Sequence, residues 1–143
     1  MLHMIIEQTK NYKKRIKYDP ETKTFNESES DSLSYVRGFF YPYGWIKESG
    51  TPPSPHWDVF LMSDKHFELG DEIEIKIIGV FIRSDKDHKM IAVEKNREIN
   101  EYEELTAHEI KALHKLYPDV REAEGWFGRK KAMEVIETCE KPL

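Results

Sequence analysis

Residues 71–83 read DEIEIKIIGVFIR, and the first half of this stretch alternates between apolar and charged side chains. Isoleucine stands at 73, 75 and 77, whereas residues 72, 74 and 76 are charged. A period of two is typical of a half-buried β-strand, because successive side chains point to opposite faces. The alternation stops at Gly79, where a glycine inside a strand indicates a bend or bulge. We therefore expect one strand that passes through a bend in a curved sheet.

Shorter apolar segments on both sides of this strand predict further strands. Residues 4–6 and 57–62 have strand character, and residues 89–94 form a return strand after a turn at 84–88. The aromatic-rich segment 35–46 predicts a strand followed by an irregular, well-packed loop. The polar segment 26–34 predicts an exposed loop or hairpin tip.

The apolar period changes near residue 106, where we expect helices to begin. Thr106, with Glu109 three residues later, fits a capping box, and Pro118 should end this helix. A second helix is expected over residues 128–140, with a stripe formed by Ala132, Val135, Ile136 and Cys139, of which Cys139 is assigned to the core. Strands first and helices last indicate the α+β class, a small barrel with two flanking C-terminal helices, in one domain over residues 1–143.

Composition excludes several classes of function. The chain has 143 residues and a formal net charge of -5, with no long basic run, so binding to nucleic acid is not expected. No stretch is apolar enough for a membrane helix, and no secretory signal is visible at residues 1–7. One cysteine excludes an internal disulfide framework. These features predict a soluble, cytoplasmic protein.

Several short motifs occur in an order that resembles one known family. They are YPYGWI at 41–46, GT at 50–51, WDVFL at 57–61, IGV at 78–80, an acidic turn before KMIAV at 89–93, and Tyr117 followed by EGW at 124–126. In this order they resemble the soluble family I inorganic pyrophosphatases. The resemblance implies a highly curved, OB-like barrel of five strands. It also implies hydrolysis of pyrophosphate by Mg²⁺ ions, two of which share and acidify the attacking water.

The resemblance also implies which residues form the site. Asp58 would be catalytic and, with Asp85 and Asp87, would bind metal. The phosphate-binding residues would be Arg15, Lys89, Tyr43 and Tyr117, and Glu7 matches a family glutamate. His56 and His88 each lie next to a site acid, and imidazole with carboxylate would suit Zn²⁺ or Mn²⁺. The alternative is that these are ordinary turn acids, rim aromatics and exposed loop histidines.

One motif departs from the family pattern. The family's Asp-x-Asp-Pro-x-Asp signature stands here as PSPHWD at 53–58, so two of its aspartates are replaced by Pro53 and Pro55. Lys17 falls where an acid usually stands. Both changes shift the local charge toward positive, and proline offers no side-chain oxygen to a metal.

Two functions remain open at this stage. The first is a divergent, weakly active hydrolase of pyrophosphate or a related phosphoanhydride. The second is a non-catalytic relative that serves as an anion-binding or protein-interaction module. In either case the expected partners are a phosphate-like anion and further copies of the same chain, with no nucleic acid and no membrane.

Overall fold

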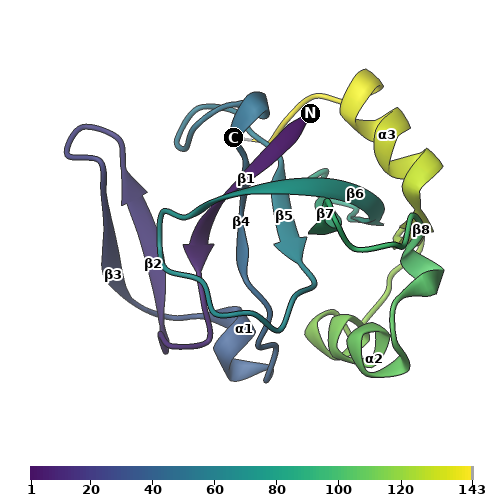
Figure 1. The fold of residues 1–143 in the computed structure, drawn as a ribbon, viewed down its shortest axis with the longest axis horizontal. Coiled ribbons are helices and arrows are strands. Elements are labelled where there is room, and N and C mark those ends of the chain that lie inside the picture. The colour runs from purple at the N-terminus through teal and green to yellow at the C-terminus, as the bar shows by residue number, and fades with distance from the viewer. Residues whose placement is uncertain (143) are drawn as a thin grey trace.

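The longest strand, β6 (Glu72–Ile82), pairs with three other strands of the sheet. The structure is a computed structural model that describes residues 1–142. Within these residues, five strands close into a barrel in the order β1 (Leu2–Gln8), β4 (Tyr43–Ile46), β5 (Asp58–Leu61), β7 (Lys89–Glu94) and β6, which pairs back to β1 (Figure 1). β5 and β7 run parallel, and the other neighbouring pairs of the barrel run antiparallel. The register of β6 against β7 shifts between Ile77 and Gly79, which confirms the predicted bulge.

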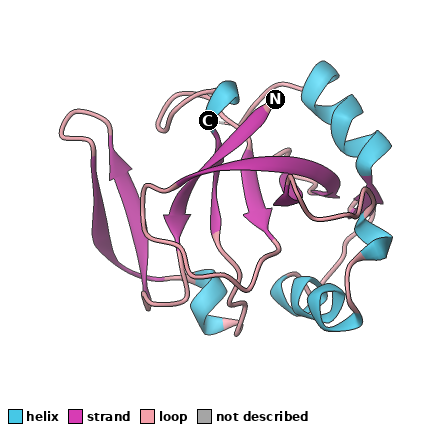
Figure 2. Cartoon of the chain, viewed as in Figure 1, coloured by secondary structure: helices cyan, strands magenta, loops and turns pink. Residues whose placement is uncertain are grey.

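The remaining elements surround the barrel (Figures 1 and 2). β2 (Lys14–Asp19) and β3 (Thr24–Asp31) form a separate hairpin that projects from one side. α1 (Leu33–Val36) and the short 3₁₀ turns η1 (Lys47–Ser49) and η2 (Tyr102–Glu104) lie in connections. α2 (Ala107–Leu116) and α3 (Arg129–Thr138) lie on the side opposite the hairpin. β8 (Gly125–Gly128) adds to the free side of β6.

The start of α2 shows why the sequence forms a helix there. The Thr106 hydroxyl accepts a hydrogen bond from the Glu109 N–H at 3.1 Å, and Glu109 Oε1 accepts one from the Thr106 N–H at 2.9 Å. The predicted capping box is therefore confirmed. Glu109 also accepts two 2.7 Å hydrogen bonds from the Arg97 guanidinium, which ties the helix to the chain just after β7.

The core covers both faces of the central strands. Val59 and Leu61 of β5 belong to an apolar cluster that includes α3, whereas Phe60 belongs to a second cluster that includes α2. β7 alternates in the same way between Met90 and Ile91. A strand buried on both faces reads as a continuous apolar run, which is the pattern of these two segments. No helix within residues 1–142 is both long and apolar enough to cross a membrane.

Three predictions about local structure were wrong, and one strand was not predicted. Residues 24–31 form β3, not a loop, because their backbone pairs with β2 even though most of their side chains are polar and exposed. Within 35–46 the order is helix, loop and then strand. β8 was not expected, since it is short and begins and ends in glycine. Cys139 is exposed because it is the extended C-cap of α3, beyond the helical stripe.

Gly44 gives a test of the barrel closure. A β-carbon at Gly44 would lie 1.8 Å from the Ile5 carbonyl oxygen, so Gly44→Ala would force β4 away from β1. We expect a loss of at least about 2 kcal/mol in the free energy of unfolding, measured by urea denaturation. Gly125→Ala is the control, because its β-carbon would meet only the flexible end of the Phe127 ring, at 3.3 Å. Equal stability of the two variants would contradict this packing.

Candidate functional site

The site is built around one ion pair between neighbouring parallel strands. Asp58 opens β5 and Lys89 opens β7, and the two residues are register partners. Lys89 is 6% exposed, and its ammonium group donates to Asp58 Oδ2 at 2.8 Å. It also donates to Asp87 Oδ2 at 3.1 Å and to Tyr43 Oη at 3.3 Å. Lys89 thus brings three of the other predicted site residues together.

His56 holds the second oxygen of Asp58. Its Nε2 lies 3.0 Å from Asp58 Oδ1, and its Nδ1 lies 2.7 Å from the Ser54 carbonyl oxygen. A carboxylate and a carbonyl oxygen both accept hydrogen bonds, so both ring nitrogens must carry protons for both contacts to form. The hydrogen bond with Asp58 accordingly raises the pKa of His56 above its usual value. Asp58 is therefore held between two cations.

The charges of this cluster support one another. Burial opposes ionisation of Asp58, but the hydrogen bonds and charges of His56 and Lys89 outweigh it and hold its pKa at about 2. Burial also opposes the charge on Lys89, yet its carboxylate neighbours raise its pKa above the usual value. Both carboxylate oxygens of Asp58 are therefore engaged, one by Lys89 and the other by His56.

A cavity of about 300 Å³ opens beside this cluster. Its walls include Glu7 of β1, Arg15 of β2, Tyr43 of β4 and Lys89 of β7. Arg83, directly after β6, and Tyr117, directly after α2, complete them. The Arg83 guanidinium lies 5.5 Å from the centre of the Tyr117 ring, and Lys89 Nζ lies 5.6 Å from that of Tyr43. Three cations and two phenols therefore surround one space.

Glu7 is the acid of this cavity that lacks a tight cationic partner among the described residues. Burial, and next the charge of the nearby Asp58, raise its pKa from 4.5 to about 7, while the charges of His56, Arg15 and Lys89 act in the opposite direction. Glu7 therefore exchanges a proton close to neutral pH.

The two aspartates of the turn after β6 are neutralised by Arg83, which directly precedes that turn. Arg83 lies 3.2 Å from Asp85 Oδ2 and 3.9 Å from Asp87 Oδ2. Asp85 Oδ1 accepts the Asp87 backbone N–H at 3.0 Å. Each aspartate of the turn is thus paired with a cation.

The donor set does not fit a metal-ion cluster. Among residues 1–142, no three His, Cys, Asp or Glu side chains gather closely enough to hold an ion. Of the two prolines in the altered motif, Pro55 lines a separate hollow near Cys139 at the end of α3. Apart from Glu7, the carboxylates of the site, Asp58, Asp85 and Asp87, already pair with lysine, arginine or histidine.

Most of the predicted site residues converge, with one clear exception. Glu7, Arg15, Tyr43, Lys89 and Tyr117 line the cavity, while Asp58, Asp87, Asp85 and His56 are connected to it through the ion pairs described above. His88 does not join them. It is buried, and its Nδ1 accepts the Arg83 backbone N–H at 2.9 Å, so it stabilises the turn.

Sequence reasoning missed Arg83. A basic residue at the end of β6, directly before the acidic turn, was the available signal. Arg37 is not among the residues that line this cavity, and it donates to the Leu116 carbonyl at the end of α2.

Comparison with known proteins identifies the family. The family model described as inorganic pyrophosphatase matches residues 4–143. The chain belongs to the inorganic pyrophosphatase family. No curated protein sequence matches it.

Solved structures of inorganic pyrophosphatases share the fold. The structure from Neisseria gonorrhoeae has a TM-score of 0.73 at 18% identity, covering 94% of this chain and 86% of the other. That from Ehrlichia chaffeensis gives 0.72 at 20%, covering 95% and 90%. That from Thermus thermophilus gives 0.69 at 17%, covering 96% and 88%. Inorganic pyrophosphatases of this family generally depend on divalent metals.

The ion pair predicts the stability of an Asp58→Asn variant. An amide cannot neutralise the buried ammonium group of Lys89, so we expect a loss of about 3 kcal/mol in the free energy of unfolding at pH 7 in EDTA. Asp85→Asn, in the exposed turn, should change stability by only about 0.5 kcal/mol. A site of uncompensated metal-binding acids would behave oppositely, since removing one acid would relieve repulsion. A neutral or stabilising effect of Asp58→Asn would contradict the assignment.

Replacement of Glu7 by glutamine should raise the free energy of unfolding by an amount that depends on pH. The pKa of Glu7 is about 7 in the folded chain, against 4.5 for an unperturbed glutamate. Its contribution to the free energy of unfolding is therefore fully present below pH 4.5, and it is lost as the pH rises through 7. We expect Glu7→Gln to be more stable than the wild type by about 3 kcal/mol at pH 8, with the difference vanishing near pH 4. Urea denaturation across pH measures it. The exposed Glu29→Gln is the control, and a constant difference at all pH values would refute the prediction.

Proposed function

We propose that this chain binds pyrophosphate or a related phosphoanhydride in the 300 Å³ cavity and hydrolyses it only weakly with Mg²⁺. The observation that carries the proposal is the engagement of both Asp58 oxygens by Lys89 and His56. A metal ion at Asp58 would have to displace one of these cations. Mn²⁺ or Zn²⁺ would meet the same competition.

The cavity can attract the anion with its own side chains. Arg15 reaches it from β2 and makes no ion pair among the described residues, so its guanidinium can form two hydrogen bonds with one phosphate group. Arg83 and Lys89 add positive charge at the other walls, and Tyr43 and Tyr117 add hydroxyl groups. Protonation of Glu7 near pH 7 removes a negative charge from the same space.

The same ion pairs also support the alternative of a non-catalytic relative. Binding requires cations at the walls, whereas rapid hydrolysis in this family needs metal-activated water. The proposal places the chain in the cytoplasm and in a homo-oligomer, as the sequence and the family resemblance imply. Exposed apolar side chains on and after α1, among them Val36 and Phe40, are available for such association.

Phosphate release from pyrophosphate, measured with Mg²⁺, Mn²⁺, Zn²⁺ or Co²⁺, tests the catalytic part. We expect turnover far below the typical enzyme value of about 10 s⁻¹, because the acids are already neutralised. Turnover at or above that value with Mg²⁺ would overturn the proposal of weak activity. No release above background with any of the four metals would favour the non-catalytic alternative.

Calorimetric titration of pyrophosphate in EDTA tests the binding part. We expect binding without metal, and Arg15→Ala should weaken it about tenfold through loss of charge-assisted hydrogen bonds. Lys23→Ala, at the tip of the β2–β3 hairpin, removes the same charge away from the cavity and should have no effect. The proposed anion site would be wrong if the metal-free protein did not bind pyrophosphate.

A further inference from the structure

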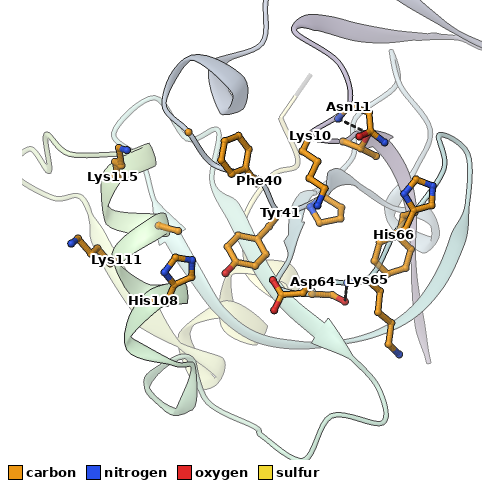
Figure 3. Close-up of a pocket in the computed structure, with 16 residues that line it drawn as sticks. Lys10, Asn11, Phe40, Tyr41, Asp64, Lys65, His66, His108, Lys111 and Lys115 are labelled. Carbon is orange, nitrogen blue, oxygen red and sulfur yellow. Dashed lines mark hydrogen bonds between the residues drawn. The ribbon is translucent and has the colours of Figure 1, made fainter.

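A further hollow, of about 450 Å³, is lined in part by Phe40, Tyr41 and Pro42, in the segment that leads into β4 (Figure 3). We call it the basic pocket. The residues that define it are Lys10, Phe40, Tyr41, His108, Lys111 and Lys115. They come from the β1–β2 connection, the segment before β4, and α2. The basic pocket shares no lining residue with the cavity beside Lys89.

The charge of this pocket is opposite to that of the whole chain. The protein carries a net charge of -5, yet Lys10, Lys111 and Lys115 line the pocket and make no ion pair within residues 1–142. A fourth lysine of the lining, Lys65, is directed to Glu94 at 2.8 Å. Asp64 is the acid of the lining, so three free ammonium groups face one carboxylate. Concentrated unpaired charge in a hollow attracts an anion.

Two of the lysines are fixed to one helix. Lys111 and Lys115 are four residues apart on α2, which puts them on the same face of the helix. Lys115 Nζ lies 3.3 Å from the point that a β-carbon of Gly38 would occupy, so its ammonium group reaches across to the opposite wall. Both lysines belong to the lining of the pocket, and Figure 3 shows them on α2, with the side chain of Lys111 extending away from Tyr41.

Aromatic rings occupy the space next to these charges. Tyr41 is buried, whereas Phe40 is 57% exposed. Figure 3 shows Phe40 and Tyr41 on consecutive positions of the chain, with the His108 ring on α2 facing Tyr41. An exposed phenyl face beside ammonium groups provides both a surface for stacking and a position for phosphate.

We propose that the basic pocket binds a small phosphorylated ligand that also carries a flat ring, that is, a nucleoside mono- or diphosphate. The lysines on α2 and Lys10 bind the phosphate groups, and Phe40 stacks on the base. The volume lies within the usual range for small-molecule sites, which is roughly 300–1,000 Å³. This site is independent of the pyrophosphate cavity and of whether that cavity is catalytic.

Calorimetric titration of ADP and AMP tests the proposal, in an Arg15→Ala background that removes a cation of the first cavity. We expect saturable binding of both nucleotides. The additional pair Lys111→Ala/Lys115→Ala should weaken it at least tenfold, and Phe40→Ala several-fold. Lys23→Ala/Lys130→Ala removes two positive charges elsewhere and should leave binding unchanged. Circular dichroism confirms that each variant is folded.

Two further ligands separate the parts of the proposal. Ribose 5-phosphate keeps the phosphate and lacks the base, so it should bind more weakly than AMP, and adenosine should bind more weakly than ADP. Equal binding of ribose 5-phosphate and AMP would overturn the stacking role of Phe40. Absence of nucleotide binding at millimolar concentration, or binding unaffected by the two α2 substitutions, would overturn the site itself. Pyrophosphate binding by the wild-type protein is measured separately, so failure of one site does not imply failure of the other.

Discussion

The ion pair between Asp58 and Lys89 constrains the centre of this structure. It lies between the first residues of two parallel strands, where hydrogen bonding of the backbone fixes the distance between them. A lysine that is 6% exposed needs a counter-ion, because transfer of an unpaired charge out of water costs far more than a protein can offset. The positions of His56, Asp87 and Tyr43 follow from this requirement, since each of them contacts one of the two charged groups.

This pairing explains how the altered motif and the rest of the site fit together. A cluster of metal-binding acids carries excess negative charge that an ion must balance. In this chain Asp58 is paired with the side chains of Lys89 and His56 instead. Arg83 does the same for the acidic turn. The acids around Asp58 and in the turn after β6 are therefore neutralised by side chains of the protein itself.

The segment before β4 separates two spaces of different character. Tyr41 lines the basic pocket and Tyr43 lines the cavity beside Lys89, with Pro42 between them. The first space has unpaired lysines and aromatic rings, whereas the second combines paired acids with cations at its walls. Two neighbouring hollows of a small acidic protein thus both present positive charge, and they differ in the apolar surface next to it.

The sequence by itself determined the features that depend on local periodicity and on motif order. Alternation over residues 72–77 located β6, Gly79 located its bulge, and Thr106 with Glu109 located the start of α2. The order of the motifs, through the resemblance to the family, predicted that Glu7, Arg15 and Lys89 belong to one site, and all three line the cavity. Tertiary structure alone decided that β3 is a strand, that Arg83 enters the cavity and that Asp58 is held by two cations. The physical reason is that backbone pairing, burial and ion pairing depend on residues far apart in the chain, which no local pattern records.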